Sequence, residues 1–185
     1  MEQHKTTDLS KYNNSWYNPG GAIKRLVWYF INVLFFINPL NPSSAIKKIL
    51  LKLFGAKIGK GVTIKPGVNI KYPWKLSIDD HSWIGENVWI DNLDQVTIGK
   101  NCCLSQGALL LCGNHNYKKE TFDLMTGTIT LEDGVWVGAK SMLTPGTVCK
   151  THSVISVQSV ASGELEAFSI YRGNPCMKIK SRIIQ

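Results

Sequence analysis

The fold of this chain is decided by residues 58–110, which read IGKGVTIKPGVNIKYPWKLSIDDHSWIGENVWIDNLDQVTIGKNCCLSQGALL. An aliphatic residue recurs every six positions, and two extra residues follow every third step. After a longer interruption the spacing resumes and continues to residue 161. An amphipathic helix would instead place apolar residues three and four apart. The positions in register, called anchors below, are Ile58, Ile64, Ile70, Ile78, Ile84, Ile90, Ile98, Leu104, Leu110, Leu131, Val137, Leu143, Cys149, Ile155 and Ala161.

A second set of positions, four residues after the anchors, carries small or β-branched side chains. The residue just before each of them is often Gly or Asn, which tolerate the positive φ of a tight corner. Six residues therefore make one short strand and one corner, and three such units make one triangular coil. Stacked coils bury a continuous aliphatic column, and insertions fall at one corner only. The second set is Val62, Val68, Ser82, Val88, Cys102, Ala108, Val135, Ser141, Thr147, Ser153 and Ser159.

The pattern divides the chain into residues 1–55, the hexapeptide-repeat β-helix at 56–170, and a C-terminal tail at 171–185. The first segment begins with a polar stretch and continues with two predicted helices. One covers residues 22–37, and its apolar run at 26–37 reaches ~18 Å, too short to span a ~30 Å hydrocarbon layer. The other begins after an N-cap at Ser43 or Ser44 and ends at Gly55.

The second predicted helix is amphipathic. Its apolar face consists of Ile46, Ile49, Leu50, Leu53 and Phe54, and Lys47, Lys48 and Lys52 lie off that face. The pattern suits two roles for residues 22–54. In the favoured one, the helices cap the open end of the β-helix, whose strand edges and core are otherwise exposed. In the other, they make a peripheral contact with anionic lipid.

Composition limits the compartment and the partners. No secretory signal precedes the repeat, and five cysteines with no Cys-x-x-Cys pair argue against a disulfide framework and a structural zinc site. We therefore expect a cytoplasmic protein, or one peripheral at the inner face of the cytoplasmic membrane. The net charge of +8 gathers near the two ends and suits a phosphorylated cofactor or anionic lipid. Aromatic and basic residues are not interleaved along the chain, so the sequence does not predict a nucleic-acid partner.

Five strings carry a resemblance: YPWKLSI at 72–78, SWIGENVWI at 82–90, NLDQVTIG at 92–99, CGNHNY at 112–117 and GNPCMKI at 173–179. They resemble the hexapeptide-repeat acyltransferases, and most closely those assigned to colanic acid biosynthesis. The resemblance implies a left-handed parallel β-helix, a homotrimer with active sites between neighbouring subunits, and acetyl-CoA as donor. It implies an O-acetyltransferase that acts on a sugar hydroxyl in surface-polysaccharide biosynthesis, with no metal.

The interruption between Leu110 and Leu131 predicts a long loop at 111–130, and insertions in repeat proteins often carry function. His115 lies at its start. An imidazole can take a proton from a hydroxyl near neutral pH, and the resemblance assigns this residue as the catalytic base. Glu120, Asp123 or a backbone carbonyl is expected to orient the ring, and the sequence leaves these alternatives open. His81 and His152 fall at corner positions that point to solvent.

By resemblance, the amide of Ala139 stabilises the oxyanion, and the coenzyme A channel includes Ala139, Val157, Gly163 and Lys180. Lys178 is a further candidate for binding the cofactor. Relatives commonly carry cations in place of Gly163 and Met177; the nearby basic residues Lys178, Lys180, Arg172 and Arg182 are candidate substitutes.

On the acceptor side, Asn92 is expected either to bind the acceptor or to cap its own turn. Tyr117 and Phe122 are expected either to form a platform for the sugar or to pack the loop down.

Two alternatives to this function remain at this point. One is a non-catalytic trimeric scaffold or binding protein of the same fold, favoured by the departures from the family pattern. The other is an acetyltransferase that acts on a different small acceptor. A zinc carbonic anhydrase of this fold would need three converging histidines, and the chain offers only His115 in the loop.

Overall fold

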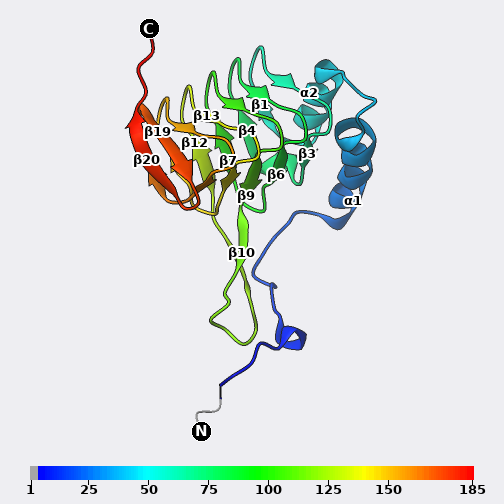
Figure 1. Ribbon diagram of the computed structural model, residues 1–185. Coiled ribbons are helices and arrows are strands. Elements are labelled where there is room, and N and C mark those ends of the chain that lie inside the picture. Colours follow the sequence, from blue (N-terminus) through cyan, green and yellow to red (C-terminus); the bar gives the residue numbers. More distant parts are fainter. Residues whose placement is uncertain (1–3) are drawn as a thin grey trace.

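The computed structural model describes residues 4–185 and contains a parallel β-solenoid with helices at one end (Figure 1). The predicted left-handed parallel β-helix is confirmed. Its strands form three faces. The first face contains β1 (Lys57–Ile58), β4 (Leu76–Ile78), β7 (Val96–Ile98), β12 (Ile129–Leu131), β15 (Val148–Cys149) and β18 (Glu164–Leu165). The second contains β2 (Thr63–Ile64), β5 (Trp83–Ile84), β8 (Cys103–Leu104), β13 (Trp136–Val137), β16 (Val154–Ile155), β19 (Ser169–Gly173) and β20 (Cys176–Ser181). The third contains β3 (Asn69–Ile70), β6 (Trp89–Asp91), β9 (Leu109–Leu111), β14 (Met142–Leu143) and β17 (Val160–Ala161).

The core of the solenoid is made of the predicted anchors. Parallel pairing places equivalent residues of successive coils above one another, as in the column Ile64, Ile84, Leu104, Val137 and Ile155. Each of these five side chains is fully buried. The small residues of the second set are buried as well, so both predicted periodicities are confirmed.

The corners also follow the sequence. Gly61, Gly107 and Gly134 have positive φ, and His81 and His152 occupy the same type of corner with φ of 60° and 58°. Insertions all fall at the corner between the third and first faces, as predicted. That corner also carries a short helical turn, η3 (Pro73–Lys75).

Three helical elements cap the N-terminal end of the solenoid: α1 (Ala22–Ile31), its π-helical continuation η2 (Asn32–Ile37), and α2 (Ser44–Leu53). Their side chains bond to the free strand edges of the first coil. The Trp28 indole donates to the carbonyl of Ile70 at 2.8 Å, and the Asn32 side chain accepts from the amide of Ile70 at 3.3 Å. Lys47 Nζ donates to the carbonyl of Lys65 at 3.0 Å. The predicted cap is therefore confirmed, as is the N-cap at Ser43.

The orientation predicted for α2 is wrong in part. Leu51 and Lys47 are fully buried against the solenoid, whereas Ile46, Ile49 and Leu53 of the predicted apolar face are exposed. The physical reason is that a strand edge presents unpaired carbonyls, so the face that covers it needs a donor. Lys47 supplies that donor.

The C-terminal segment is more ordered than the predicted tail. β19 and β20 form an antiparallel hairpin on the second face of the solenoid. The repeat itself shortens just before this hairpin, because the next buried aliphatic residue after the anchor Ala161 is Leu165, four positions later instead of six. Within residues 4–185, no helix has the length and hydrophobicity needed to cross a membrane.

Candidate active site

The predicted loop forms a β-hairpin that projects away from the solenoid (Figure 1). Its strands are β10 (Gly113–His115) and β11 (Leu124–Thr126), with His115 opposite Leu124. The amide of Gly127 donates to the carbonyl of Cys112 at 2.9 Å and closes the base of the hairpin. The hydroxyl of Thr126 contacts Asp94 at 3.1 Å and ties the hairpin to the neighbouring corner. His115 is therefore held on a braced element.

The imidazole of His115 is fixed by the residue on which it stacks. Its ring lies parallel to the ring of Phe122, with centroids 4.5 Å apart and an interplanar angle of 5°. Its Nδ1 lies 3.0 Å from the carbonyl oxygen of Phe122, whose φ of 50° turns that oxygen towards the ring. A carbonyl only accepts, so Nδ1 is the protonated nitrogen in this hydrogen bond. Nε2 then carries the lone pair that a general base needs.

The two candidate carboxylates are engaged elsewhere. Hydrogen bonds from Thr121 and Lys119 hold the pKa of Asp123 below its usual value, and Lys119 Nζ lies 3.1 Å from this carboxylate. Glu120 forms an ion pair with Lys11. The sequence left three orienting groups open, and in the structure the one that contacts the imidazole is a backbone carbonyl, that of Phe122.

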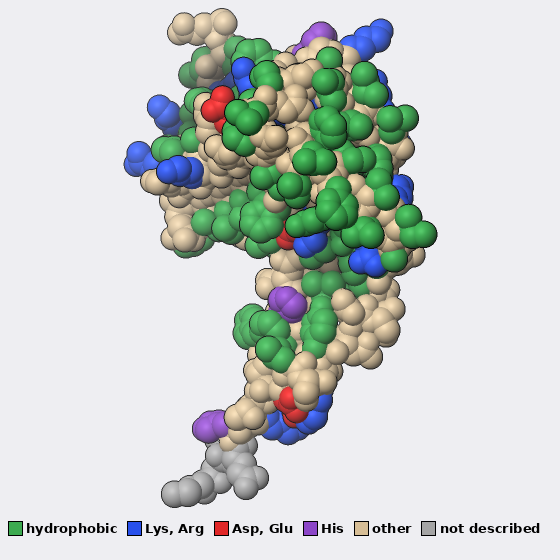
Figure 2. Space-filling model, turned by 90° about the vertical axis from the view of Figure 1, so that its right-hand side faces the viewer, with side chains coloured by type: hydrophobic (Ala, Val, Ile, Leu, Met, Phe, Trp, Pro, Cys, Tyr) green, Lys and Arg blue, Asp and Glu red, His purple; other side chains and the backbone are tan. Residues whose placement is uncertain are grey.

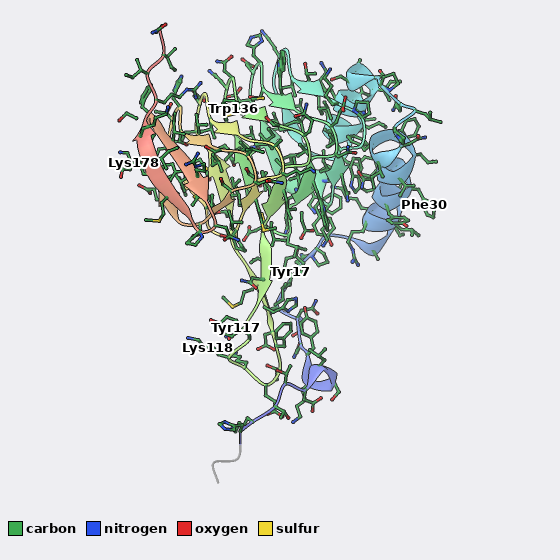
Figure 3. All side chains as sticks on the ribbon, viewed as in Figure 1. Tyr17, Phe30, Tyr117, Lys118, Trp136 and Lys178 are labelled. Carbon is green, nitrogen blue, oxygen red and sulfur yellow. The ribbon has the colours of Figure 1, made fainter. Side chains whose placement is uncertain are left out.

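A segment that the sequence did not implicate lies against this hairpin. Residues 8–17, called the strap below, include the short helical turn η1 (Leu9–Lys11). The amide of Asp8 donates to the carbonyl of Glu120 at 2.9 Å, and the ring of Tyr12 lies 5.9 Å from the imidazole of His115. Figure 3 shows Tyr17 near the base of the hairpin, where its hydroxyl donates to the carbonyl of Leu93 at 2.7 Å. The strap is polar and has no periodicity, so no sequence signal pointed to this contact.

The three predicted acceptor residues have different environments. Asn92 is fully buried, and its amide bonds to the backbone of Tyr72 in both directions and to the carbonyl of Lys75. Asn92 therefore caps the corner of the preceding coil and not its own turn. Tyr117 is 74% exposed on the hairpin, and Phe122 supports the imidazole. Tyr117 thus has a face free for a ligand, whereas Phe122 packs the hairpin.

The residues predicted to bind coenzyme A lie on the C-terminal coils. Ala139 and Val157 occupy equivalent corners, where the amide of Gln158 donates to the carbonyl of Ala139 at 2.9 Å. Val157 is 60% exposed, and within residues 4–185 the amide of Ala139 makes no hydrogen bond. An exposed corner with an unused amide beside it suits a ligand that carries a carbonyl.

The basic residues predicted for that site differ in whether another group of the chain already pairs with them. Lys178 Nζ lies 2.6 Å from Glu166, whereas Lys180 has no carboxylate at ion-pair distance within residues 4–185. Arg182, a candidate substitute for the missing cations, donates to the carbonyls of Gly134 and His152 and so caps a corner. Gly163 is exposed with φ of 68°, and apart from its chain neighbours a Cβ there would meet no atom within 4 Å.

Two members of these groups, Tyr117 and Lys178, lie far apart within one chain. Figure 3 shows Tyr117 on the projecting hairpin and Lys178 on β20, at the far end of the solenoid.

The cysteines offer no competing nucleophile. All five are free thiols, and burial raises the pKa of Cys102 to about 11 and that of Cys112 to about 12. Burial also raises the pKa of Cys103, Cys149 and Cys176. Near neutral pH these groups stay protonated, whereas a nucleophilic cysteine reacts as the thiolate.

A separate pocket of about 350 Å³ lies between the cap and the first coils. Tyr72 and Trp89 line it, together with Lys71 and Asp91, whose charged groups are 2.9 Å apart. Arg25 reaches the same pocket, and its Nε is buried with no hydrogen-bond partner among the described residues. The pocket shares no residue with the His115 hairpin.

Comparison with known proteins adds two sequence relatives and one solved structure of the same fold, and no family model matches the chain. The protein of Escherichia coli named "Putative colanic acid biosynthesis acetyltransferase WcaF" is 33% identical over 164 residues, which is 89% of this chain and 90% of that protein. The galactoside O-acetyltransferase of Escherichia coli is 24% identical over 152 residues, covering 80% of this chain and 75% of its own. A hexapeptide-repeat acetyltransferase of Vibrio cholerae, solved with acetyl-CoA, shares the fold with a TM-score of 0.80 at 19% identity, and the match covers 90% and 93% of the two chains.

Proposed function

The chain belongs to the hexapeptide-repeat acetyltransferases, and from that membership we propose that it transfers an acetyl group from acetyl-CoA to a sugar hydroxyl with His115 as general base. The observation that carries the proposal is the hydrogen bond between His115 Nδ1 and the carbonyl of Phe122, because it fixes the ring and assigns the lone pair of the neutral imidazole to Nε2. Acetyl-CoA as donor is supported by the structure of the Vibrio cholerae acetyltransferase, which contains it.

The reaction is a direct transfer. Nε2 of His115 accepts the proton of the acceptor hydroxyl, and the hydroxyl oxygen forms a bond to the thioester carbonyl carbon. The carbon–sulfur bond then breaks, and the imidazolium returns the proton to the departing thiolate. The Phe122 carbonyl stabilises the imidazolium through the Nδ1 proton. The amide of Ala139, which makes no hydrogen bond within residues 4–185, is the proposed donor to the oxyanion.

A sugar in surface-polysaccharide biosynthesis is the proposed acceptor. The name of the WcaF relative refers to colanic acid, and the 24% identical relative acetylates galactosides by its name. Tyr117 offers an exposed aromatic face of the kind that packs on a sugar ring, and Phe122 supports the base beside it.

The proposed assembly is a homotrimer, in which the hairpin of one subunit reaches Ala139, Val157, Gly163 and Lys180 of a neighbour. The separation of Tyr117 and Lys178 within one chain supports it. The proposed compartment is the cytoplasm, where free thiols such as the five in this chain persist.

The test is the release of free coenzyme A from acetyl-CoA with a panel of nucleotide sugars, oligosaccharides and small alcohols. It compares the wild type, His115→Ala and His115→Asn. The asparagine amide can donate to the Phe122 carbonyl in place of Nδ1 but offers no base, so it separates the base from the structural bond. We expect both variants to lose about 100-fold or more of kcat.

Other outcomes assign the alternatives. Equal release by His115→Asn and the wild type contradicts His115 as the base. Turnover only with a small non-sugar acceptor overturns the sugar assignment. No acetyl-CoA binding by the wild type supports the non-catalytic scaffold.

A further inference from the structure

The cap turns many apolar side chains towards solvent. They lie on the outer sides of α1, η2 and α2, and we call this surface the outer cap face. Figure 3 shows Phe30 on the outside of α1, pointing away from the solenoid, and Figure 2 views this end of the molecule, where hydrophobic side chains are spread widely. Exposed fractions reach 81% at Ile23 and 74% at Leu53. The face comprises Ile23, Leu26, Phe30, Leu34, Ile49 and Leu53.

The orientation of α2 makes this exposure unusual. An amphipathic helix normally turns its apolar stripe to the core and its lysines to water. Here Lys47 is buried and Ile49 and Leu53 are exposed. The solenoid edge explains why Lys47 points inwards, but it does not explain why aliphatic residues occupy the opposite side. Exposed apolar patches on soluble domains mark interaction sites, so the outer cap face fits an apolar phase or partner.

The charged residues around the outer cap face indicate the chemistry of its partner. No aspartate or glutamate occurs between Asp8 and Asp79, and this stretch supplies Lys24, Lys48 and Lys52 to the cap itself. Lys52 is exposed and Lys48 is half-buried on α2, and Lys57 and Lys60 follow on the first coil. Two aspartates of the coils lie near the cap, and both are engaged: Asp80 accepts a hydrogen bond from the amide of Lys60, and Asp91 pairs with Lys71 in the pocket beside α1. An apolar face with a cationic rim is complementary to a membrane interface with anionic headgroups.

We propose that the outer cap face docks the protein on the surface of an anionic lipid bilayer. The aliphatic and aromatic side chains enter the headgroup and acyl boundary, and the lysines meet phosphates. The contact is peripheral, because no helix within residues 4–185 is long enough to cross a bilayer. The proposal does not depend on the identity of the acceptor or on His115. Vesicle binding and acetyl transfer are measured separately, so the failure of one proposal is distinguished from the failure of the other.

The experiment is co-sedimentation of the full chain with phosphatidylcholine vesicles, with and without about one-third phosphatidylglycerol. The wild type is expected to bind the anionic vesicles, and binding should weaken as NaCl rises. Leu26→Gln/Phe30→Gln should reduce the partition coefficient onto the vesicles about tenfold or more, because two side chains that enter the bilayer lose their apolar contact with lipid. Lys48→Gln/Lys52→Gln should bind less and depend less on salt.

The matched control is Ile183→Gln/Ile184→Gln, which removes two exposed aliphatic residues from the opposite end of the chain. It should bind vesicles as the wild type does. Circular dichroism and mass in solution establish that each variant is folded and keeps its assembly. No binding by the wild type, equal loss in the control, or a changed mass in Leu26→Gln/Phe30→Gln would each overturn the proposal, the last by making the face a contact between copies of the chain.

Discussion

Replacing Asn32 with alanine tests how the cap protects the end of the solenoid. Asn32 is 7% exposed, and its side-chain oxygen accepts from the amide of Ile70 at 3.3 Å. Its side-chain nitrogen donates to the side chain of Asn69 at 2.7 Å. Asn32→Ala removes both bonds and leaves the amide of a fully buried residue, Ile70, with no acceptor.

The expected loss follows from these contacts. A buried amide without a partner costs about 1–3 kcal/mol, and the lost bond to Asn69 adds about 0.5–1.5 kcal/mol. Alanine is the better helix former and returns about 0.5 kcal/mol. We therefore expect Asn32→Ala to lower the free energy of unfolding by about 1–4 kcal/mol.

The assay is urea unfolding followed by circular dichroism at one fixed protein concentration, since assembly would otherwise shift the midpoint. The control is Asn13→Ala, whose side chain accepts only one exposed bond, from Ser15, and which should stay within about 0.5 kcal/mol of the wild type. If Asn32→Ala unfolds at the same urea concentration as Asn13→Ala, the cap does not stabilise the strand edge in the way described.

Three further predictions concern the strap, the corners and the thiols. Tyr12→Ala should lower kcat/KM for coenzyme A release by about 2- to 10-fold, since an aromatic contact contributes ~0.5–1.5 kcal/mol; unchanged kinetics would show that the ring does not shape the site. Gly134→Ala should lower the melting temperature more than Gly146→Ala. Both glycines have positive φ, but of the two only Gly134 would place a Cβ against another side chain, that of His152 at 2.6 Å. Equal shifts in melting temperature would contradict this. Stability should fall as the pH rises above about 9, because burial raises the pKa of Cys102 to about 11 and of Cys112 to about 12. The folded state keeps these protons longer than the unfolded chain, so the contribution is complete below the unfolded pKa and is lost towards the folded values. Urea midpoints from about pH 8 to about pH 10.5 should decline less in Cys102→Ala/Cys112→Ala, and an equal decline would assign the effect to other groups.

The hexapeptide period, by itself, determined the solenoid, its buried anchors and its corners. A short strand and a corner repeat in register, so burial and backbone conformation are set within each six-residue unit and can be read along the chain. The interruption after Leu110 likewise located the hairpin, because an insertion breaks a strict count. The caps of α2 followed from local signals at Ser43 and Gly55.

The tertiary structure alone decided how the site and the cap are completed. Tyr12 meets His115 although the two are far apart in the sequence, and no local pattern encodes such a contact. The Phe122 carbonyl reaches the imidazole because the hairpin turns there with positive φ. A phenylalanine in the sequence does not predict this backbone conformation. Lys47 points inwards because a strand edge elsewhere in the chain lacks a donor. In each case the deciding contact is polar or aromatic, and the path of the whole chain brings its two partners together. The structure of one repeat, by contrast, depends only on its own six residues.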